Sequence, residues 1–150
     1  MPRLLLVLLF LLSWVSPLGA SQIDIRSQHM EVLEQEKIAV FSGKVKARKG
    51  DLRIWADRLY VYYRTVKGKR EVVKLIALGN VRIEKGPWRS LSGKAVYFRK
   101  DDRLVLEDHP RVWHGKDEVR GAVVIIYFQD DRSEVLSGPG QPVEAYVYTD

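Results

Sequence analysis

A unit of about 30 residues recurs three times along this chain. Each copy opens with a short turn that ends in valine: Gly-Lys-Val at 43–45, Gly-Asn-Val at 79–81 and Pro-Arg-Val at 110–112. A basic turn containing glycine comes next, and an apolar run rich in aromatic residues completes the unit. A single copy cannot bury its apolar face alone, so the copies must stack on one another. The repeat therefore predicts a stacked array rather than an enclosed catalytic core.

The repeated units have the pattern of β-strands. The odd-numbered residues of 73–83, 91–97 and 119–127 are apolar or glycine, the period of two that is typical of half-buried strands. Turns rich in glycine, aspartate and proline separate these stretches, so the strands are expected to run up and down. The pattern predicts an all-β fold, either a flattened sandwich or an open antiparallel β-jelly roll built from stacked hairpins.

One of these strands changes its inward face. The apolar residues of 52–56 share one phase and those of 59–63 share the opposite phase, so the change falls near Asp57. A bulge or corner there would let one long strand leave one sheet and enter a second. Gly93 and Gly121 occupy the equivalent places in the later units, where a missing side chain permits the same bend.

Residues 1–20 have the pattern of an export signal. A leucine-rich segment at 4–15 follows Arg3, and Pro17 and Ala20 supply a helix breaker and a small residue at the expected cut. This segment is shorter than the roughly 20 apolar residues that span a bilayer. We expect a cleaved signal peptide at 1–20, a single domain at 21–150 and a location in the periplasm. An uncleaved membrane anchor is the alternative.

The composition limits the classes of partner. The chain contains no cysteine, which excludes both a lipoprotein anchor and structural disulfides. The formal net charge is +6, and basic and acidic residues are interleaved without long blocks of one sign. For an exported protein, this mild positive bias favours a phosphate-bearing lipid or an acidic glycan over nucleic acid.

Patterns for catalysis or metal binding are weak. His109 and His114 lie five residues apart, which puts them on opposite faces of a strand, and His29 is far away in sequence. The aspartate pairs at 101–102 and 130–131 fit hairpin turns. The sequence has no Gly-x-Ser-x-Gly motif, cysteine nucleophile or phosphate-binding loop. We therefore expect no enzyme, no metal and no cofactor.

The order of the motifs resembles the OstA-like family, and most closely the LptA-type periplasmic bridge proteins of lipopolysaccharide transport. The resemblance covers roughly residues 23–148 and rests on the Gly-x-Val turns, the Ala-Asp-Arg-Leu-Tyr-Val-Tyr run at 56–62, Ser-Gly-x-Ala-x-Tyr at 92–97 and Arg-Gly at 120–121. The chain departs from the family pattern at Pro110, which replaces a glycine turn, and in the lengthened hairpin at 67–70.

The resemblance implies a fold and a function. The fold is an open, slightly twisted β-jelly roll with a hydrophobic groove for the acyl chains of lipopolysaccharide, in its lipid A part. The family implies head-to-tail stacking from an inner-membrane anchor protein to an outer-membrane barrel, with no bond made or broken. The apolar residues that one face of the long strands offers to this groove are Val45, Ile54, Leu59, Val61, Leu75, Val81, Ile83, Leu91, Tyr97, Leu106, Val112, Val123 and Ile125. Packing in a dry core is the alternative role of the same residues.

Two further sets of residues would serve such a protein. Basic residues in the turns would meet lipid phosphates, and these are Lys49, Lys85, Arg89 and Lys116. The first and last strands of an open array leave backbone groups unpaired and are expected to join copies head to tail. The residues assigned to these edges are Ile23, Ile25, Val143, Ala145 and Val147, with pairing beginning after Pro142, which cannot donate a ladder hydrogen bond.

Two other functions fit parts of the pattern. The first is the membrane-anchored component of the same transport system, which would share the fold and retain residues 4–15. The second is an exported glycan-binding or structural β-protein, in which aromatic residues such as Trp55, Trp88 and Trp113 would stack on sugars. Aromatic residues are also favoured in strands, where they pack across the sheet.

Overall fold

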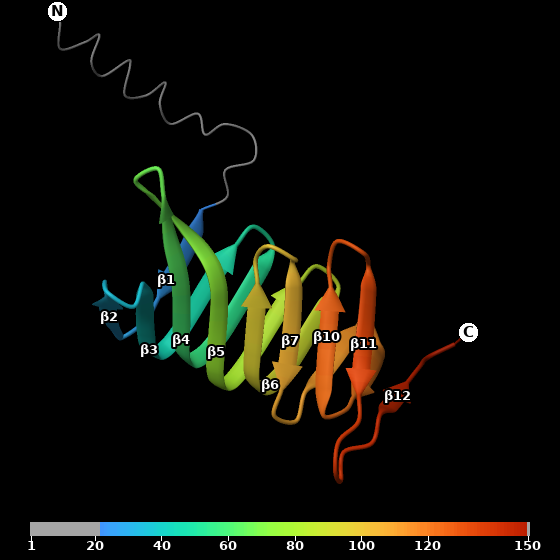
Figure 1. Cartoon of the computed structure of the whole chain (residues 1–150). Coiled ribbons are helices and arrows are strands. Elements are labelled where there is room, and N and C mark those ends of the chain that lie inside the picture. Colours follow the sequence, from blue (N-terminus) through green and yellow to red (C-terminus); the bar gives the residue numbers. More distant parts are fainter. Residues whose placement is uncertain (1–21, 150) are drawn as a thin grey trace, which may run out of the picture.

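The computed structural model describes residues 22–149, which form an antiparallel β-fold (Figure 1). This part of the chain contains no helix capable of crossing a membrane. The predicted signal peptide lies outside the described residues. The strands in chain order are β1 (Ile23–Arg26), β2 (His29–Leu33), β3 (Ile38–Lys49), β4 (Leu52–Val66), β5 (Lys69–Lys85), β6 (Trp88–Phe98), β7 (Arg103–Glu107), β8 (Arg111–His114), β9 (Asp117–Arg120), β10 (Val123–Tyr127), β11 (Arg132–Leu136) and β12 (Glu144–Tyr146).

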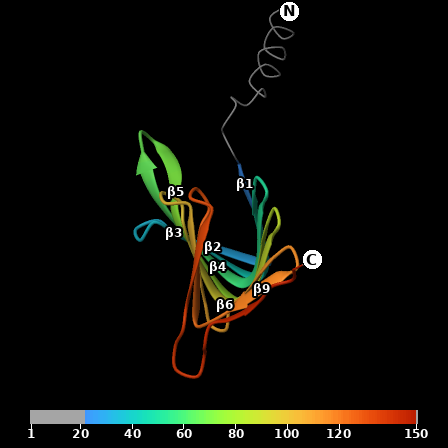
Figure 2. The ribbon, with the colours of Figure 1, turned by 90° about the vertical axis from the view of Figure 1, so that its right-hand side faces the viewer.

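The sheet is folded into two walls. Wall A contains, in spatial order, β2, the first half of β3, the second half of β4, the first half of β5, the second half of β6, β7, β10 and β11. Wall B contains β1, the other halves of β3 to β6, and then β8, β9 and β12. Figure 2 shows the strands curving from one wall into the other. The predicted all-β, open antiparallel fold is confirmed.

Two kinds of corner alternate where the strands pass between the walls. On β3 and β5 the corner is a pair of left-handed residues, with φ of 82° and 48° at Gly43 and Lys44 and of 79° and 47° at Gly79 and Asn80. Asp108 repeats this conformation, with a φ of 62°, between β7 and β8. The intervening strands β4 and β6 turn without left-handed residues, and the extra residue of each register shift lies on the neighbouring β3 or β5.

The corner of β5 is locked by the neighbouring strand. A β-carbon at Gly79 would lie 2.5 Å from Oδ2 of Asp57 on β4. The side chain of Asn80 donates a hydrogen bond to the same oxygen, with a donor–acceptor distance of 2.9 Å. Glycine is therefore required both for the left-handed backbone and for space. The phase change predicted near Asp57 is confirmed.

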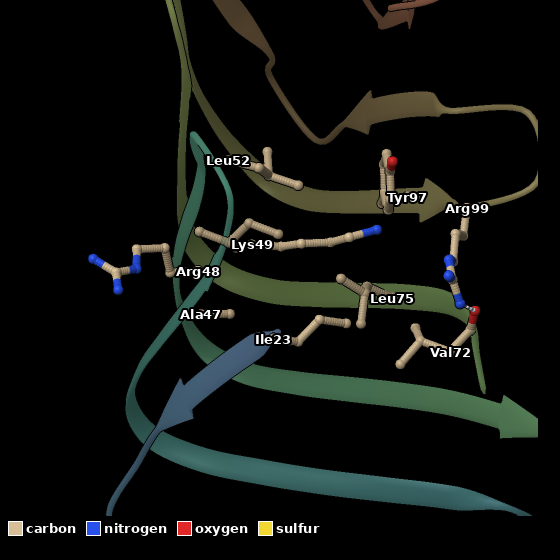
Figure 3. Close-up of a pocket in the computed structure, with 10 residues that line it drawn as sticks. Ile23, Ala47, Arg48, Lys49, Leu52, Val72, Leu75, Tyr97 and Arg99 are labelled. Atoms are coloured by element: carbon tan, nitrogen blue, oxygen red, sulfur yellow. Dashed lines mark hydrogen bonds between the residues drawn. The ribbon is translucent and has the colours of Figure 1, made fainter. Parts of the chain in front are cut away.

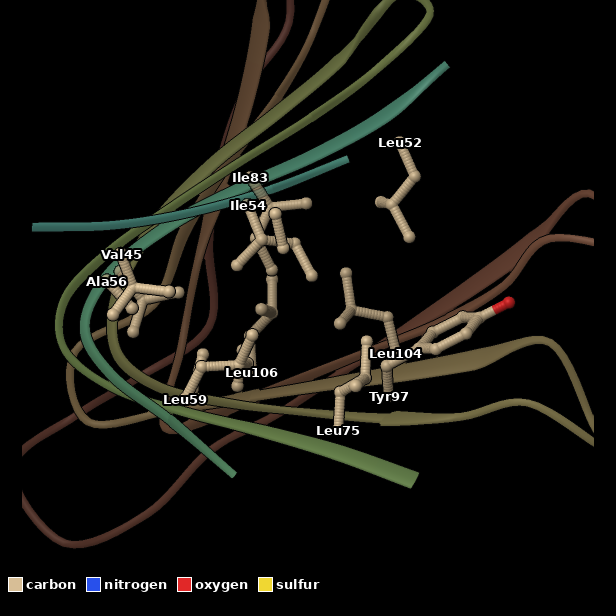
Figure 4. Close-up of a cluster of buried hydrophobic side chains, with 14 of the residues drawn as sticks. Val45, Leu52, Ile54, Ala56, Leu59, Leu75, Ile83, Tyr97, Leu104 and Leu106 are labelled. Carbon is tan, nitrogen blue, oxygen red and sulfur yellow. The ribbon is translucent and has the colours of Figure 1, made fainter. Parts of the chain in front are cut away.

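The inner faces of the two walls meet in one apolar core. Ile54 and Ile83 of wall B point toward Leu75 and Leu104 of wall A (Figure 4). The buried apolar residues of this core are Ala39, Phe41, Val45, Ala47, Leu52, Ile54, Ala56, Leu59, Val61, Leu75, Ala77, Val81, Ile83, Ala95, Tyr97, Leu104, Leu106, Val112, Val124 and Ile126.

Three residues predicted for the inner face lie on the outer face instead. Leu91 is 41% exposed, and the buried residues beside it are Ser90 and Ser92. Val123 and Ile125 are only half-buried, whereas Val124 and Ile126 between and beside them are buried. The sequence pattern predicted one continuous alternation of inward and outward residues through Gly93 and through Gly121. In the structure, the chain bends at each of these glycines and the inward-facing positions shift by one residue.

Candidate binding site between the walls

Ten of the predicted groove residues lie on the inner faces of the walls. They are Val45, Ile54, Leu59, Val61, Leu75, Val81, Ile83, Tyr97, Leu106 and Val112, and all are buried. They come from strands far apart in sequence, and the folding of each long strand across both walls brings them together. The sequence reading missed other inward residues, among them Phe41, Leu52, Leu104, Val124 and Ile126. At the corners of β4 and β6 the inward residues step by three, from Ala56 to Leu59 and from Ser92 to Ala95. The same step taken from Gly121 would have placed Val124 and Ile126 on the inner face.

An apolar cavity opens between the walls near the first strand. Its volume is about 20 Å³, which is room for about one water molecule. The labelled side chains in Figure 3 converge on it from both walls, whereas Arg48 points away to the outside. The residues that line the cavity are Ile23, Ala47, Arg48, Lys49, Leu52, Ile54, Val72, Leu75, Tyr97 and Arg99.

A second small cavity lies further along the same interior. Its volume is about 10 Å³, and it sits between Ile83 and Lys85 of wall B and Leu104, Ile126 and Phe128 of wall A. The interior is therefore filled by the protein's own side chains. A ligand with long apolar chains can enter only if the walls move apart or these side chains rotate.

Charged residues surround the mouth of the first cavity, where a wider space of about 180 Å³ lies between Lys49, Lys85 and Asp102. Burial and the neighbouring Arg99 both lower the pKa of Lys49, while Asp102 acts in the opposite direction. Tyr97 donates a hydrogen bond to Asp102. Burial, followed by this hydrogen bond, raises the pKa of Tyr97. Two cations thus face each other at the edge of an apolar interior, with one carboxylate beside them.

Lys85 connects the two walls at the same edge. Its Nζ lies 3.0 Å from Oδ1 of Asp51 on wall B. The same ammonium group lies 5.2 Å from the ring centroid of Phe128, which follows β10 of wall A. A cation over a ring at this distance is weakly attractive. Lys85 therefore contacts wall A only weakly, through Phe128, while its ion pair with Asp51 stays within wall B.

Only two of the four predicted phosphate-binding residues lie at the mouth. Lys49 and Lys85 are there, but Arg89 lies on the outer face of wall B, and Lys116 lies in the exposed turn between β8 and β9. The sequence reading missed Arg99, which follows β6 and reaches the mouth only because the strand crosses from wall B to wall A. No local pattern distinguishes it from the other basic turn residues.

Comparison with known proteins decides the family. Residues 24–132 match the family described as "LptA/(LptD N-terminal domain) LPS transport protein". The chain belongs to this LptA/LptD N-terminal family. No curated protein matches the chain. Membership makes it a protein of a lipopolysaccharide transport family, as the resemblance had indicated.

A solved protein of low sequence identity has the same fold. It is LptH from Pseudomonas aeruginosa, described as the LptA-homologous periplasmic component of the conserved lipopolysaccharide transport device. The TM-score is 0.77 at 14% sequence identity, and the match covers 85% of this chain and 96% of that chain. At this identity the likeness shows a shared fold.

The two ends of the LptA/LptD N-terminal fold are open edges. β1 and β2 form one end, with Ile23 lining the first cavity and Ile25 packed on the core. β11 and β12 form the other end. The last strand is shorter than expected: it includes Ala145, whereas Val143 and Val147 flank it and are 49% and 65% exposed. The sequence reading missed β11 as the second edge strand at this end.

Proposed function

We propose that this protein binds lipopolysaccharide by the acyl chains of its lipid A part, between walls A and B, and passes it across the periplasm. In this proposal, copies join head to tail into a bridge from an inner-membrane anchor protein to an outer-membrane barrel. The observation that carries the proposal is the continuous apolar inner surface of a two-walled sheet in a chain of the LptA/LptD N-terminal family.

The filled interior sets the mechanism of loading. Because the two cavities hold about one water each, an acyl chain has to replace contacts between the walls with contacts to itself. Apolar contact is non-directional, and the free energy of burying a methylene, about 0.8 kcal/mol, is similar for a side chain and an acyl chain. The exchange therefore costs little once the mouth has opened, and a bound chain can slide along the groove.

The mouth supplies the polar half of the site. Lys49, Lys85 and Arg99 surround the opening, and their charges are only partly balanced by Asp51 and Asp102. Lipid phosphates would compete with these two carboxylates for the three cations. Exposed ion pairs contribute about 0–1 kcal/mol each, so salt should weaken capture only modestly.

A pair of adjacent aromatic residues tests the inner site. Tyr97 is buried between the walls, and Phe98, the next residue of β6, lies on the outer face of wall A. We expect a photoreactive phenylalanine derivative at position 97 to crosslink lipopolysaccharide and the same derivative at position 98 to do so weakly. Thermal melting of both proteins checks that they are folded. Equal crosslinking at the two positions would place the lipid outside the walls.

The compartment is tested separately. We propose a periplasmic location with removal of residues 1–20, so intact mass of the protein from cells should correspond to residues 21–150. A full-length mass would instead favour the anchored component of the transport system, because that protein would keep the apolar segment.

A further inference from the structure

The outer face of wall B carries two straight rows of side chains that run across all eight strand segments. Cross-strand pairing places the first row at Arg26, Lys46, Trp55, Arg82, Leu91, Arg111, Arg120 and Glu144. The second row, two residues along each strand, consists of Asp24, Arg48, Arg53, Glu84, Arg89, Trp113, Glu118 and Tyr146.

The charge of these rows is strongly one-sided. They hold eight basic and four acidic residues, a net charge of +4. The outer face of wall A differs: its central row contains no basic residue and runs through Glu31, Val40, Tyr60, Ile76, Val96, Val105, Ile125 and Glu134. The rows that flank it do hold cations, namely Arg58, Lys74, Lys94, Arg103 and Arg132, with Glu107 among them. Net positive charge is therefore denser on the outer face of wall B than on that of wall A.

Several cations in the rows are held by aromatic rings and not by carboxylates. The guanidinium of Arg82 lies 4.0 Å from the ring centroid of Trp55, and Nζ of Lys46 lies 5.7 Å from it. Arg89 lies 4.9 Å from the ring of Trp113. Within residues 22–149, none of these three cations has an acidic partner at ion-pair distance. Their N–H donors are oriented by the rings yet remain free for an outside anion.

The same contacts argue against stacking of sugars or bases on Trp55. Lys46 and Arg82 lie on the strands either side of Trp55, so cations flank the ring from both directions. A stacking platform needs an open ring face. The cations around Trp55 therefore favour a partner that presents anionic groups to this surface.

We propose that the outer face of wall B is a docking surface for an anionic phospholipid bilayer. Eight strands about 4.8 Å apart extend the rows over about 34 Å. The cations are spread over both rows, and four of them, Arg26, Lys46, Arg48 and Arg53, surround one hollow of about 460 Å³ at the β1 end. A plane of phosphates meets both rows, whereas a single linear polyanion would follow only one. Each basic residue near an anionic surface strengthens binding about fivefold, and tryptophan and tyrosine favour the headgroup region.

Vesicle sedimentation with the full mature chain tests this surface. The vesicles contain equal parts of phosphatidylglycerol and phosphatidylcholine, with pure phosphatidylcholine as the reference. We expect binding only to the anionic vesicles. The double variant Lys46→Glu/Arg82→Glu should bind at least about 25-fold more weakly, since two cations are lost. The matched control Lys69→Glu/Lys100→Glu changes the net charge equally at two exposed positions of wall A, the first residue of β5 and the turn after β6, and should bind much like the parent protein.

Three outcomes would overturn the proposal. Equal binding to pure phosphatidylcholine would show that apolar contact, and not charge, drives adsorption. Equal loss of vesicle binding in the two double variants would show that binding depends on the net charge of the protein and not on the cations of wall B. Binding to heparin without binding to anionic vesicles would make a linear polyanion the partner.

A change of the opposite sign provides an independent check. Glu118 is the acidic residue that pairs with both Arg111 and Arg120, at 3.0 and 2.7 Å. Glu118→Gln frees both guanidinium groups and should strengthen binding to anionic vesicles about fivefold. Weaker binding by a folded Glu118→Gln protein would contradict the docking surface. Raising salt to about 0.5 M should release the vesicles but leave lipopolysaccharide crosslinking at position 97, so each proposal can fail without the other.

Discussion

Gly79 is held at its corner by two separate constraints, and a pair of variants separates them. Gly79→Ala places a side chain on a left-handed residue, which costs about 1–2 kcal/mol, and also brings the new carbon to 2.5 Å from Asp57. Gly50 has a φ of 59° with nothing within 4 Å of a β-carbon. Gly50→Ala should therefore lose only the stability that the left-handed backbone costs a residue with a side chain. Urea denaturation should show the larger loss for Gly79→Ala, and equal losses would mean that Asp57 moves aside freely.

Glu118 gives the stability of wall B a defined pH dependence. The hydrogen bond from Arg120 is the main cause that lowers the pKa of Glu118, and Arg111 adds to it. A lowered carboxyl pKa stabilises the fold above the unfolded value, about 4.3, and this contribution is lost as pH falls through the folded value. The difference in melting temperature between the parent protein and Glu118→Gln should be largest near neutral pH and shrink below about pH 4. If the difference in melting temperature persisted unchanged in acid, packing of the side chain and not its charge would be the cause.

Strand β10 shows what the corners do to a whole element. Ile126 is 3% exposed and faces the core, whereas Ile125 lies on the outer face. Ile126→Asp should destabilise the fold by several kcal/mol, because it buries a carboxylate without a partner. Ile125→Asp should cost much less and should leave crosslinking of lipopolysaccharide at position 97 intact. Thermal melting and the crosslinking assay check the two variants, and a reversed order of stability would contradict the register of β10.

The sequence predicted the strands, the turns between them and the corner near Asp57, because alternation and turn chemistry are local properties. It also predicted the inner residues of β4 and β5 correctly. It failed at Leu91, Val123 and Ile125 because Gly93 and Gly121 have no side chain. Each glycine is compatible with an inward or an outward position, so the change of inward phase at that residue leaves no trace in the pattern. The position of Arg99 at the mouth depends on which wall a strand ends in, and that is a property of the folded sheet.

The open ends of the whole molecule predict how copies associate. Joining unlike edges is a heterologous contact that does not close, so assemblies should lengthen with concentration. Deleting residues 143–150 removes β12 from the edge but leaves β11, so light scattering should show reduced growth. A deletion of residues 149–150 alone keeps β12 and should behave like the parent protein. Unchanged growth after the longer deletion would exclude β12 from the contact.

The docking surface and the bridge that we propose place different demands on the orientation of the molecule. A copy in the bridge has its long axis running between the membranes, whereas a copy docked through wall B has that axis parallel to a bilayer. One copy cannot do both at once. Docking on a bilayer therefore belongs to free copies, and assembly into a bridge should release them.

The consecutive pairing of the long strands also bears on how the chain folds. The four long strands β3 to β6 pair in sequence order, and the short strands β1, β2, β7 and β8 pair with the long strand nearest to them in sequence. Further along, β7 pairs with β10 and β9 pairs with β12 across intervening strands. Local pairing of this kind lets folding proceed unit by unit. A chain delivered through a narrow channel with its N-terminus first can therefore add each strand as it emerges. During that growth, the last strand formed pairs its free backbone groups with the next segment of the same chain. When the chain ends, the final strand still has free backbone groups, and a strand of another molecule can pair with them.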